Sequence, residues 1–236
     1  MSDRMWTRIA AAGGIFYVLL TLLGNDVLGS GGEGPDMTAT RSQIGAYVGT
    51  HPPTALSWAA LYIELLGILA FVFFLGSLWS VLRRAEGEHG PFSAIAFGAG
   101  LVSVGVKIAS LPAAIAAFYR AQEGMDPQLA AALLDMNGVS FVLTWAIDAV
   151  LLAATAVVVL RTGALPRWLG WIAAVLSPAL LVGVAFATSF GFVPYVLYTT
   201  LWIVATSIVL IRHAGEPSLT KKDAPLGEAA SAHSVH

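Results

Sequence analysis

Apolar residues in this chain come in long runs that polar and helix-breaking residues interrupt. Six runs are long enough to cross a hydrocarbon core about 30 Å thick, which takes about 20 helical residues. They lack the alternating polarity of β-barrel strands, which are nearer to about 10 residues long. The pattern therefore predicts an all-α protein, a polytopic integral membrane bundle of six transmembrane helices. The predicted spans are residues 6–28, 54–82, 91–118, 138–160, 166–188 and 193–211.

Two connecting segments are long enough to hold short helices of their own. In the first, Ile44, Tyr47 and Val48 share one helical face, which predicts an amphipathic helix that rests on the membrane surface or on the bundle. In the second, Asp126 and Pro127 predict the start of a short helix that precedes the fourth span. We expect this second helix to pack across the mouth of the bundle.

Composition narrows the class of protein further. Hydrophobic residues make up 57% of the chain and charged residues 11%, whereas a soluble domain has about 25% charged residues. The chain has no cysteine, which excludes disulfides, thiolate metal sites and a cysteine nucleophile. Its five histidines are scattered, so we expect no metal site and no cofactor. The formal net charge of -2 gives no indication of a nucleic-acid partner.

Lysine and arginine positions predict the orientation, because cytoplasmic loops of membrane proteins are enriched in them. A cytoplasmic N-terminus leaves only Arg41 and Arg120 on the outside and Lys107 within the membrane. We therefore expect both termini in the cytoplasm, with a transmembrane domain over residues 1–214 and a disordered cytoplasmic tail over residues 215–236. The nine basic residues predicted to be cytoplasmic are Arg4, Arg8, Arg83, Arg84, Arg161, Arg167, Arg212, Lys221 and Lys222.

Four segments together resemble a family of short bacterial integral membrane proteins of unknown function. They are LRRAEG, SAIAFGAG, DPQLAAALLD and RTGALPRWLGW, beginning at positions 82, 93, 126 and 161. The likeness covers nearly the whole chain up to about Arg212. It implies a multi-pass protein of the bacterial cytoplasmic membrane. The family has no established activity or functional residues that could be carried over to this chain.

Three charged residues lie inside predicted spans. Lys107 is costly there, since a lysine at the centre of a membrane helix costs roughly 2.5–3.5 kcal/mol and generally has a partner or a function. Glu64 and Asp148 lie near the midplane of their own spans, and the tilt of Cβ atoms brings all three heads toward one level. We therefore predict an intramembrane charge cluster of Glu64, Lys107 and Asp148. The supporting polar residues on the same helical faces are Ser103, Ser110 and Thr144.

The cluster leaves two functions open. One is a structural ion pair that fixes helix register in a structural or interacting membrane component. The alternative is a small proton- or cation-coupled transporter, in which the surplus negative charge is neutralised by a proton or a bound cation. Against transport, the six spans show no inverted repeat of their special residues, since the fifth span has no counterpart of Glu64.

We predict that the chain is not an enzyme. No motif of a metalloprotease, a serine hydrolase or a nucleotide-binding loop is present. A Ser–Lys dyad can be drawn from Ser103 or Ser110 with Lys107, but hydroxyl groups are common at close helix contacts without catalysis. The expected partners are the lipid bilayer and either a second copy of the chain or another membrane protein.

Overall fold

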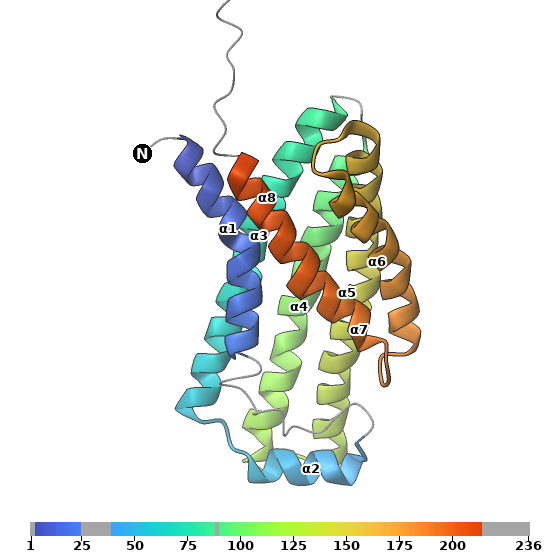
Figure 1. Cartoon of the computed structure of the whole chain (residues 1–236). Helices are drawn as coiled ribbons and strands as arrows, with labels where there is room; N and C mark the ends of the chain where they lie inside the picture. The colour runs from blue at the N-terminus through green and yellow to red at the C-terminus, as the bar shows by residue number, and fades with distance from the viewer. Residues whose placement is uncertain (1–2, 25–38, 88–89, 214–236) are drawn as a thin grey trace, which may run out of the picture.

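The structure is a computed structural model, and it describes residues 3–24, 39–87 and 90–213. These residues form helices and no strands, and six helical segments are long and apolar enough to cross a membrane, which confirms the predicted bundle (Figure 1). The predicted tail, residues 215–236, lies outside the described ranges. The elements are α1 (Asp3–Leu22), α2 (Arg41–Thr50), α3 (Ala55–Glu86), α4 (Phe92–Ala121), α5 (Pro127–Thr162), α6 (Arg167–Ala185), and a last crossing of α7 (Phe192–Val196), the π-helix η2 (Leu197–Ile203) and α8 (Val204–His213).

Local sequence sets several helix ends. α2 begins at a capping box, in which the Thr40 side chain accepts from the Gln43 backbone and the Gln43 side chain accepts from the Thr40 N–H. α5 begins with an Asp126 cap followed by Pro127, whose missing N–H costs nothing in a first turn. It ends at Gly163, whose φ of 70° is favourable only for glycine.

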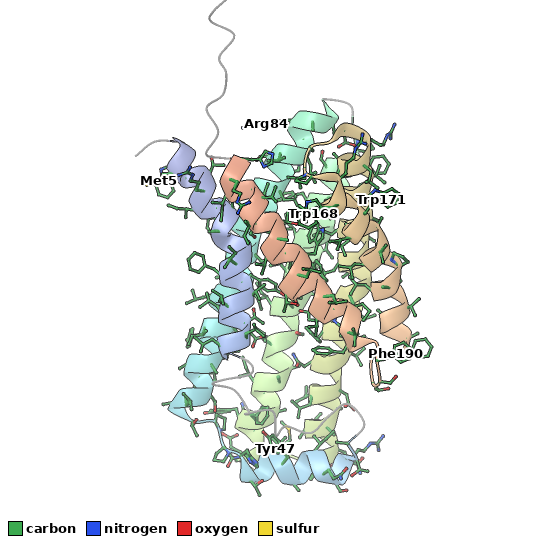
Figure 2. The ribbon with its side chains drawn as sticks, in the orientation of Figure 1. Met5, Tyr47, Arg84, Trp168, Trp171 and Phe190 are labelled. Carbon is green, nitrogen blue, oxygen red and sulfur yellow. The ribbon has the colours of Figure 1, made fainter. Side chains whose placement is uncertain are left out.

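The two ends of the bundle differ in charge. Arg84 and Trp168 lie at the end where α1 starts and α8 finishes, and Tyr47 of α2 lies at the opposite end (Figure 2). We call these the basic end and the α2 end. The basic end also carries Arg83 and Arg161, in the last turns of α3 and α5, and Arg167, the first residue of α6.

Helix lengths also divide the bundle. α1 has 20 residues and α6 has 19, each about 30 Å long, whereas α3, α4 and α5 have 32, 30 and 36 residues. The three long helices therefore extend past the short ones toward α2, which lies across the ends of α4 and α5 (Figure 1). The prediction of a separate short helix after Asp126 is wrong, because that segment is the first part of the continuous α5.

Packing near the basic end is tight. A Cβ at Gly13 of α1 would run into the carbonyl oxygen of Ala70 in α3, and one at Gly14 would run into Ser207 of α8. Such small residues let helix backbones approach closely in lipid. Leucines fill the space between α3 and α5, with Leu75 and Leu151 both packed against Gly100 of α4.

A second, smaller apolar cluster lies at the α2 end. Ile44 and Val48 of α2 pack on Ala131 of α5, with Tyr47 and Phe118 beside them. This contact confirms the apolar face predicted for α2 and shows that the face rests on the bundle itself. The two clusters are separate, and the candidate site lies between them.

Candidate functional site

A buried ion pair joins α4 to α5. The Lys107 ammonium donates to Asp148 Oδ2 at 3.3 Å and to Ser103 Oγ at 3.1 Å. Lys107 is 6% exposed and Asp148 is completely buried. Removing both groups from water is costly, and their mutual attraction in a low-dielectric interior offsets that cost only when the two stay together.

Helix geometry explains why these two residues meet. Lys107 lies 15 residues after Phe92, the start of α4, and Asp148 lies 14 residues before Thr162, the end of α5. Both are therefore about 21–23 Å from the basic ends of their helices. α4 and α5 also share the most extensive contact between any two described helices. Equal depth on neighbouring antiparallel helices brings the ammonium and the carboxylate together.

Aromatic rings surround the ammonium. The Lys107 Nζ lies 5.8 Å from the ring centre of Tyr17 and 5.9 Å from those of Phe71 and Tyr195. Each distance is within the range of a cation–π interaction, which contributes about 0.5–2 kcal/mol depending on desolvation. The Tyr17 and Tyr195 hydroxyls are 3.4 Å apart, so the first and last crossings meet over the lysine.

The supporting residues have different roles. Ser103 accepts from the ammonium, as described above, whereas Ser110 Oγ donates to the Lys107 carbonyl at 2.8 Å. The Asn137 amide donates to the Ser110 hydroxyl and carbonyl, which ties α5 to α4 a second time. Thr144 donates within its own helix to the Phe141 carbonyl. Of the three predicted hydroxyls, Ser103 is therefore the one that bonds the charged group.

A cavity of about 1190 Å³ extends from the ion pair toward α2. Its walls come from α1, α2, α3, α4, α5 and the last crossing. Lys107 and Tyr195 line its inner end, and Tyr47, His51 and Trp58 line it near α2. Asp148 is not among the lining residues, so the lysine separates the aspartate from the cavity.

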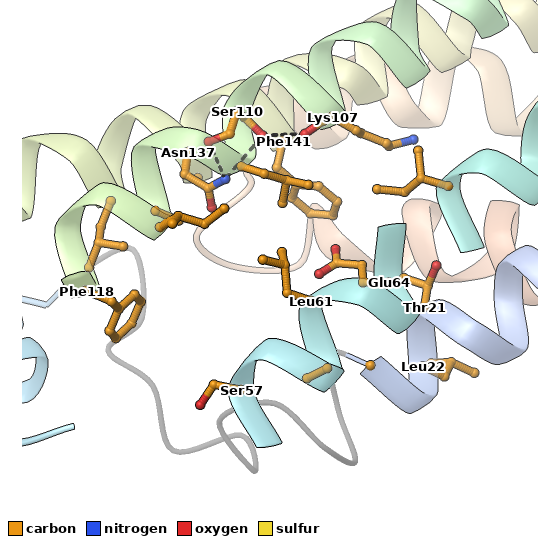
Figure 3. A pocket seen from close by; sticks show the side chains of 18 of the residues that line it. Thr21, Leu22, Ser57, Leu61, Glu64, Lys107, Ser110, Phe118, Asn137 and Phe141 are labelled. Atoms are coloured by element: carbon orange, nitrogen blue, oxygen red, sulfur yellow. Dashed lines mark hydrogen bonds between the residues drawn. The ribbon is translucent and has the colours of Figure 1, made fainter. Parts of the chain in front are cut away.

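Glu64 occupies the α3 wall of this cavity. Its side chain is partly buried and points into the space between α3 and the α4–α5 pair, where Leu61 and Phe141 also lie (Figure 3). The predicted cluster is therefore arranged in two parts, with Lys107 bridged to Asp148 and Glu64 set in the wall on another helix.

Comparison with known proteins gives no match. No sequence family, curated protein or solved structure matches the chain. The site must therefore be interpreted from its own chemistry. Among the described residues, no group of three or more histidines, aspartates or glutamates is placed to hold a metal ion.

One atom of the pair lacks a partner. Asp148 Oδ1 is buried and makes no hydrogen bond within 3.5 Å in the described parts of the chain. The Tyr198 hydroxyl lies beside this carboxylate and is also buried without a hydrogen-bond partner. A carboxylate oxygen that makes no hydrogen bond can still accept a proton, or a hydrogen bond from a neighbouring hydroxyl such as that of Tyr198, so this corner of the site has unused acceptor capacity.

The aromatic residues of the site were not predicted. Tyr195, Tyr198 and Trp202 are buried at helical spacing on one face of the last crossing, and Tyr17 comes from α1. Their spacing was visible in the sequence, but aromatic residues at this spacing are more often ordinary core residues. Only the arrangement of the helices shows that Tyr17 and Tyr195 approach Lys107.

Proposed function

We propose that this chain is a non-enzymatic, multi-pass structural or interacting component of the bacterial cytoplasmic membrane, in which the Lys107–Asp148 pair holds α4 against α5. The observation that supports this role is the complete burial of Asp148. Asp148 lies behind the lysine and does not line the cavity. This position suits a fixed ion pair better than a site that exchanges protons or cations. A second copy or another membrane protein is the partner that we propose within the bilayer.

A liposome experiment distinguishes this role from the alternative. The double variant Lys107→Met with Asp148→Leu removes both charges, and replacing a whole buried pair is often neutral for stability. Purified wild-type protein and this variant are reconstituted, a proton gradient is imposed, and internal pH is read with a trapped dye. We expect both to dissipate the gradient at the rate of protein-free liposomes. Faster dissipation by the wild type alone would contradict the structural role.

The alternative is a small proton- or cation-coupled transporter that uses Glu64, Lys107 and Asp148. Two observations favour it as the second candidate. The cavity reaches Lys107 from the α2 end, and Asp148 Oδ1 retains unused acceptor capacity. Intramembrane ionisable residues beside a cavity are typical of ion pathways. If the chain is such a transporter, the wild type dissipates the proton gradient faster than protein-free liposomes do, and the double variant does not.

We further propose that both termini are cytoplasmic, from the excess of lysine and arginine at the basic end. Because the chain has no cysteine, single cysteines can be labelled without background. Cysteines at Ser42 and Glu123 are expected to react with an impermeant thiol reagent on intact cells. Cysteines at Ala85 and Ala164 are expected to react only after the cells are opened. The reverse pattern would contradict this orientation.

A further inference from the structure

Several arginines at the basic end have no charge partner among the described residues. Five of them are exposed, and their side chains make no hydrogen bond, ion pair or ring contact within the described parts of the chain. At the α2 end, by contrast, Arg120 is paired with Glu123. The five side chains are therefore available to bind a partner from outside the chain. They are Arg8, Arg84, Arg161, Arg167 and Arg212.

Two other charged groups at this end hold α3 to α4. Glu86 accepts hydrogen bonds from the backbone N–H groups of Phe92 and Ser93, at 2.8 and 2.7 Å. Arg83 donates to the carbonyl oxygen of Gly90 at 3.4 Å. The Glu86 carboxylate is thus committed to the start of α4 and forms no ion pair with the five exposed arginines.

Arg161 and Arg167 lie on the two sides of one short turn. Arg161 is in the last turn of α5 and Arg167 is the first residue of α6, with residues 163–166 between the two helices. So short a connection keeps the two helix ends adjacent. The turn therefore presents two positive charges at one place, and no described carboxylate pairs with either of them.

Exposed tryptophans place these arginines at the level of the lipid headgroups. Trp168 and Trp171 of α6 are 48% and 63% exposed, and Trp171 lies one helical turn after Arg167 on the same face (Figure 2). Trp6, two residues before Arg8 in α1, is 57% exposed. Tryptophan is enriched where the hydrocarbon core meets the polar headgroups. The exposed guanidinium groups therefore lie where the phosphate groups of a bilayer lie.

The chemistry of these side chains favours a phosphate partner. A guanidinium group is planar and presents a fork of N–H donors that fits two oxygens of one phosphate. The tryptophans beside the arginines favour a lipid over a soluble acidic partner, because their rings are suited to the membrane interface.

We propose that the basic end binds the headgroups of anionic phospholipids in preference to zwitterionic ones, and that Arg161 and Arg167 form one such site at the α5–α6 turn. Phosphate oxygens accept from the two guanidinium groups, and the net negative charge of the headgroup supplies the preference. This binding goes beyond the structural role of the Lys107–Asp148 pair and does not depend on it.

Two spin-labelled lipids that differ in headgroup charge test the proposal. The full chain is reconstituted in vesicles of phosphatidylcholine with a trace of spin-labelled phosphatidylglycerol or of spin-labelled phosphatidylcholine. Electron paramagnetic resonance gives the fraction of each labelled lipid that the protein immobilises, and hence a relative association constant. We expect this constant to be about two- to fivefold larger for phosphatidylglycerol at low salt, and the difference to shrink as salt screens the charges.

Two double variants with the same loss of charge locate the site. Arg161→Gln with Arg167→Gln is expected to remove about half of the preference for phosphatidylglycerol, because it removes two adjacent members of the five exposed arginines. Arg41→Gln with Arg120→Gln, at the α2 end, is the matched control and is expected to keep most of the preference, since Arg120 is already paired. Thermal unfolding verifies that both variants are folded.

The following results overturn the proposal. Folded wild-type protein immobilises the two labelled lipids equally, or its preference persists undiminished at high salt. The same holds if the folded variant of the α5–α6 turn loses no more of the preference than the α2-end control, since the arginines of the turn would then not form a site. None of these results bears on the Lys107–Asp148 pair.

Discussion

The half of the bundle nearest the basic end and the half nearest α2 are built differently. From the basic end to the Lys107–Asp148 pair, which we call the packed half, leucines and close glycine contacts leave the helices tightly interlocked. From the pair to α2, which we call the hollow half, the same long helices surround a cavity of about 1190 Å³. Sequence hydropathy does not distinguish the halves, because both are helical and apolar.

The number of neighbours each helix has explains the difference. In the packed half all six crossings run side by side, so the long helices are covered by α1, α6 and α8. Among the described residues, α3, α4 and α5 are the crossings that continue beyond the ends of α1 and α6, and the ten-residue α2 covers the ends of α4 and α5. The cavity begins beside the last turns of α1 and the first turns of the last crossing, and it continues into this part of the bundle, where fewer described helices enclose it.

Breaking the ion pair is expected to have the largest effect. Asp148→Asn leaves the Lys107 ammonium buried without its counter-charge and is expected to cost about 3–5 kcal/mol of unfolding free energy. The measurement is unfolding by a denaturing detergent in mixed micelles, followed by tryptophan fluorescence. Asp135→Asn, at an exposed carboxylate, is the matched control. A loss no larger than that of the control would show that the pair does not hold α4 to α5.

Trimming one leucine in each half tests the contrast directly. Leu151→Ala opens a void in the packed half and is expected to cost about 2 kcal/mol, at the low end of the usual range because lipid is itself apolar. Leu111→Ala only enlarges the existing cavity and is expected to cost less than about 1 kcal/mol. The same unfolding assay gives both values, and equal losses would contradict the division into halves.

Adding one methyl group tests the close helix contacts of the packed half. Gly13→Ala places a Cβ against the Ala70 carbonyl and is expected to cost about 1–2 kcal/mol, despite the better helix propensity of alanine. Gly76→Ala, where a Cβ meets nothing within 4 Å, gains up to about 1 kcal/mol from propensity alone. Both variants are compared by thermal unfolding in the same detergent. Equal stability of the two would mean that α1 and α3 do not interlock at Gly13.

The sequence predicted the fold well because six apolar runs of helical length can form few structures other than a bundle of six membrane-spanning helices. It predicted the start of α5 at Asp126 but not its continuity, since length and hydropathy cannot tell a loop helix from the extension of a span. It also placed Glu64 and Asp148 at similar depth, so either could have paired with Lys107. The extensive contact of α4 with α5 favours Asp148, and that contact is a property of the folded bundle.

The aromatic residues around Lys107 were beyond sequence reasoning for a related reason. Tyr17 and Tyr195 lie 178 positions apart, and nothing in the chain between them indicates that α1 and the last crossing meet. The π-helix from Leu197 to Ile203 begins two residues after Tyr195, and such segments often mark functional sites. Its presence depends on packing and cannot be read from residue type.

Water access along α4 tests the central claim, that one helix passes from a packed half into a hollow half. Ala114 lines the cavity and Ala96 is 2% exposed in the packed half. The cysteine-free chain allows Ala114→Cys and Ala96→Cys to be compared with a small, water-soluble thiol reagent in nanodiscs, with modification followed by mass spectrometry. We predict that the cysteine at position 114 is modified rapidly and the one at position 96 stays unmodified until the protein unfolds. Equal reactivity at the two positions, or protection at position 114, would contradict this account.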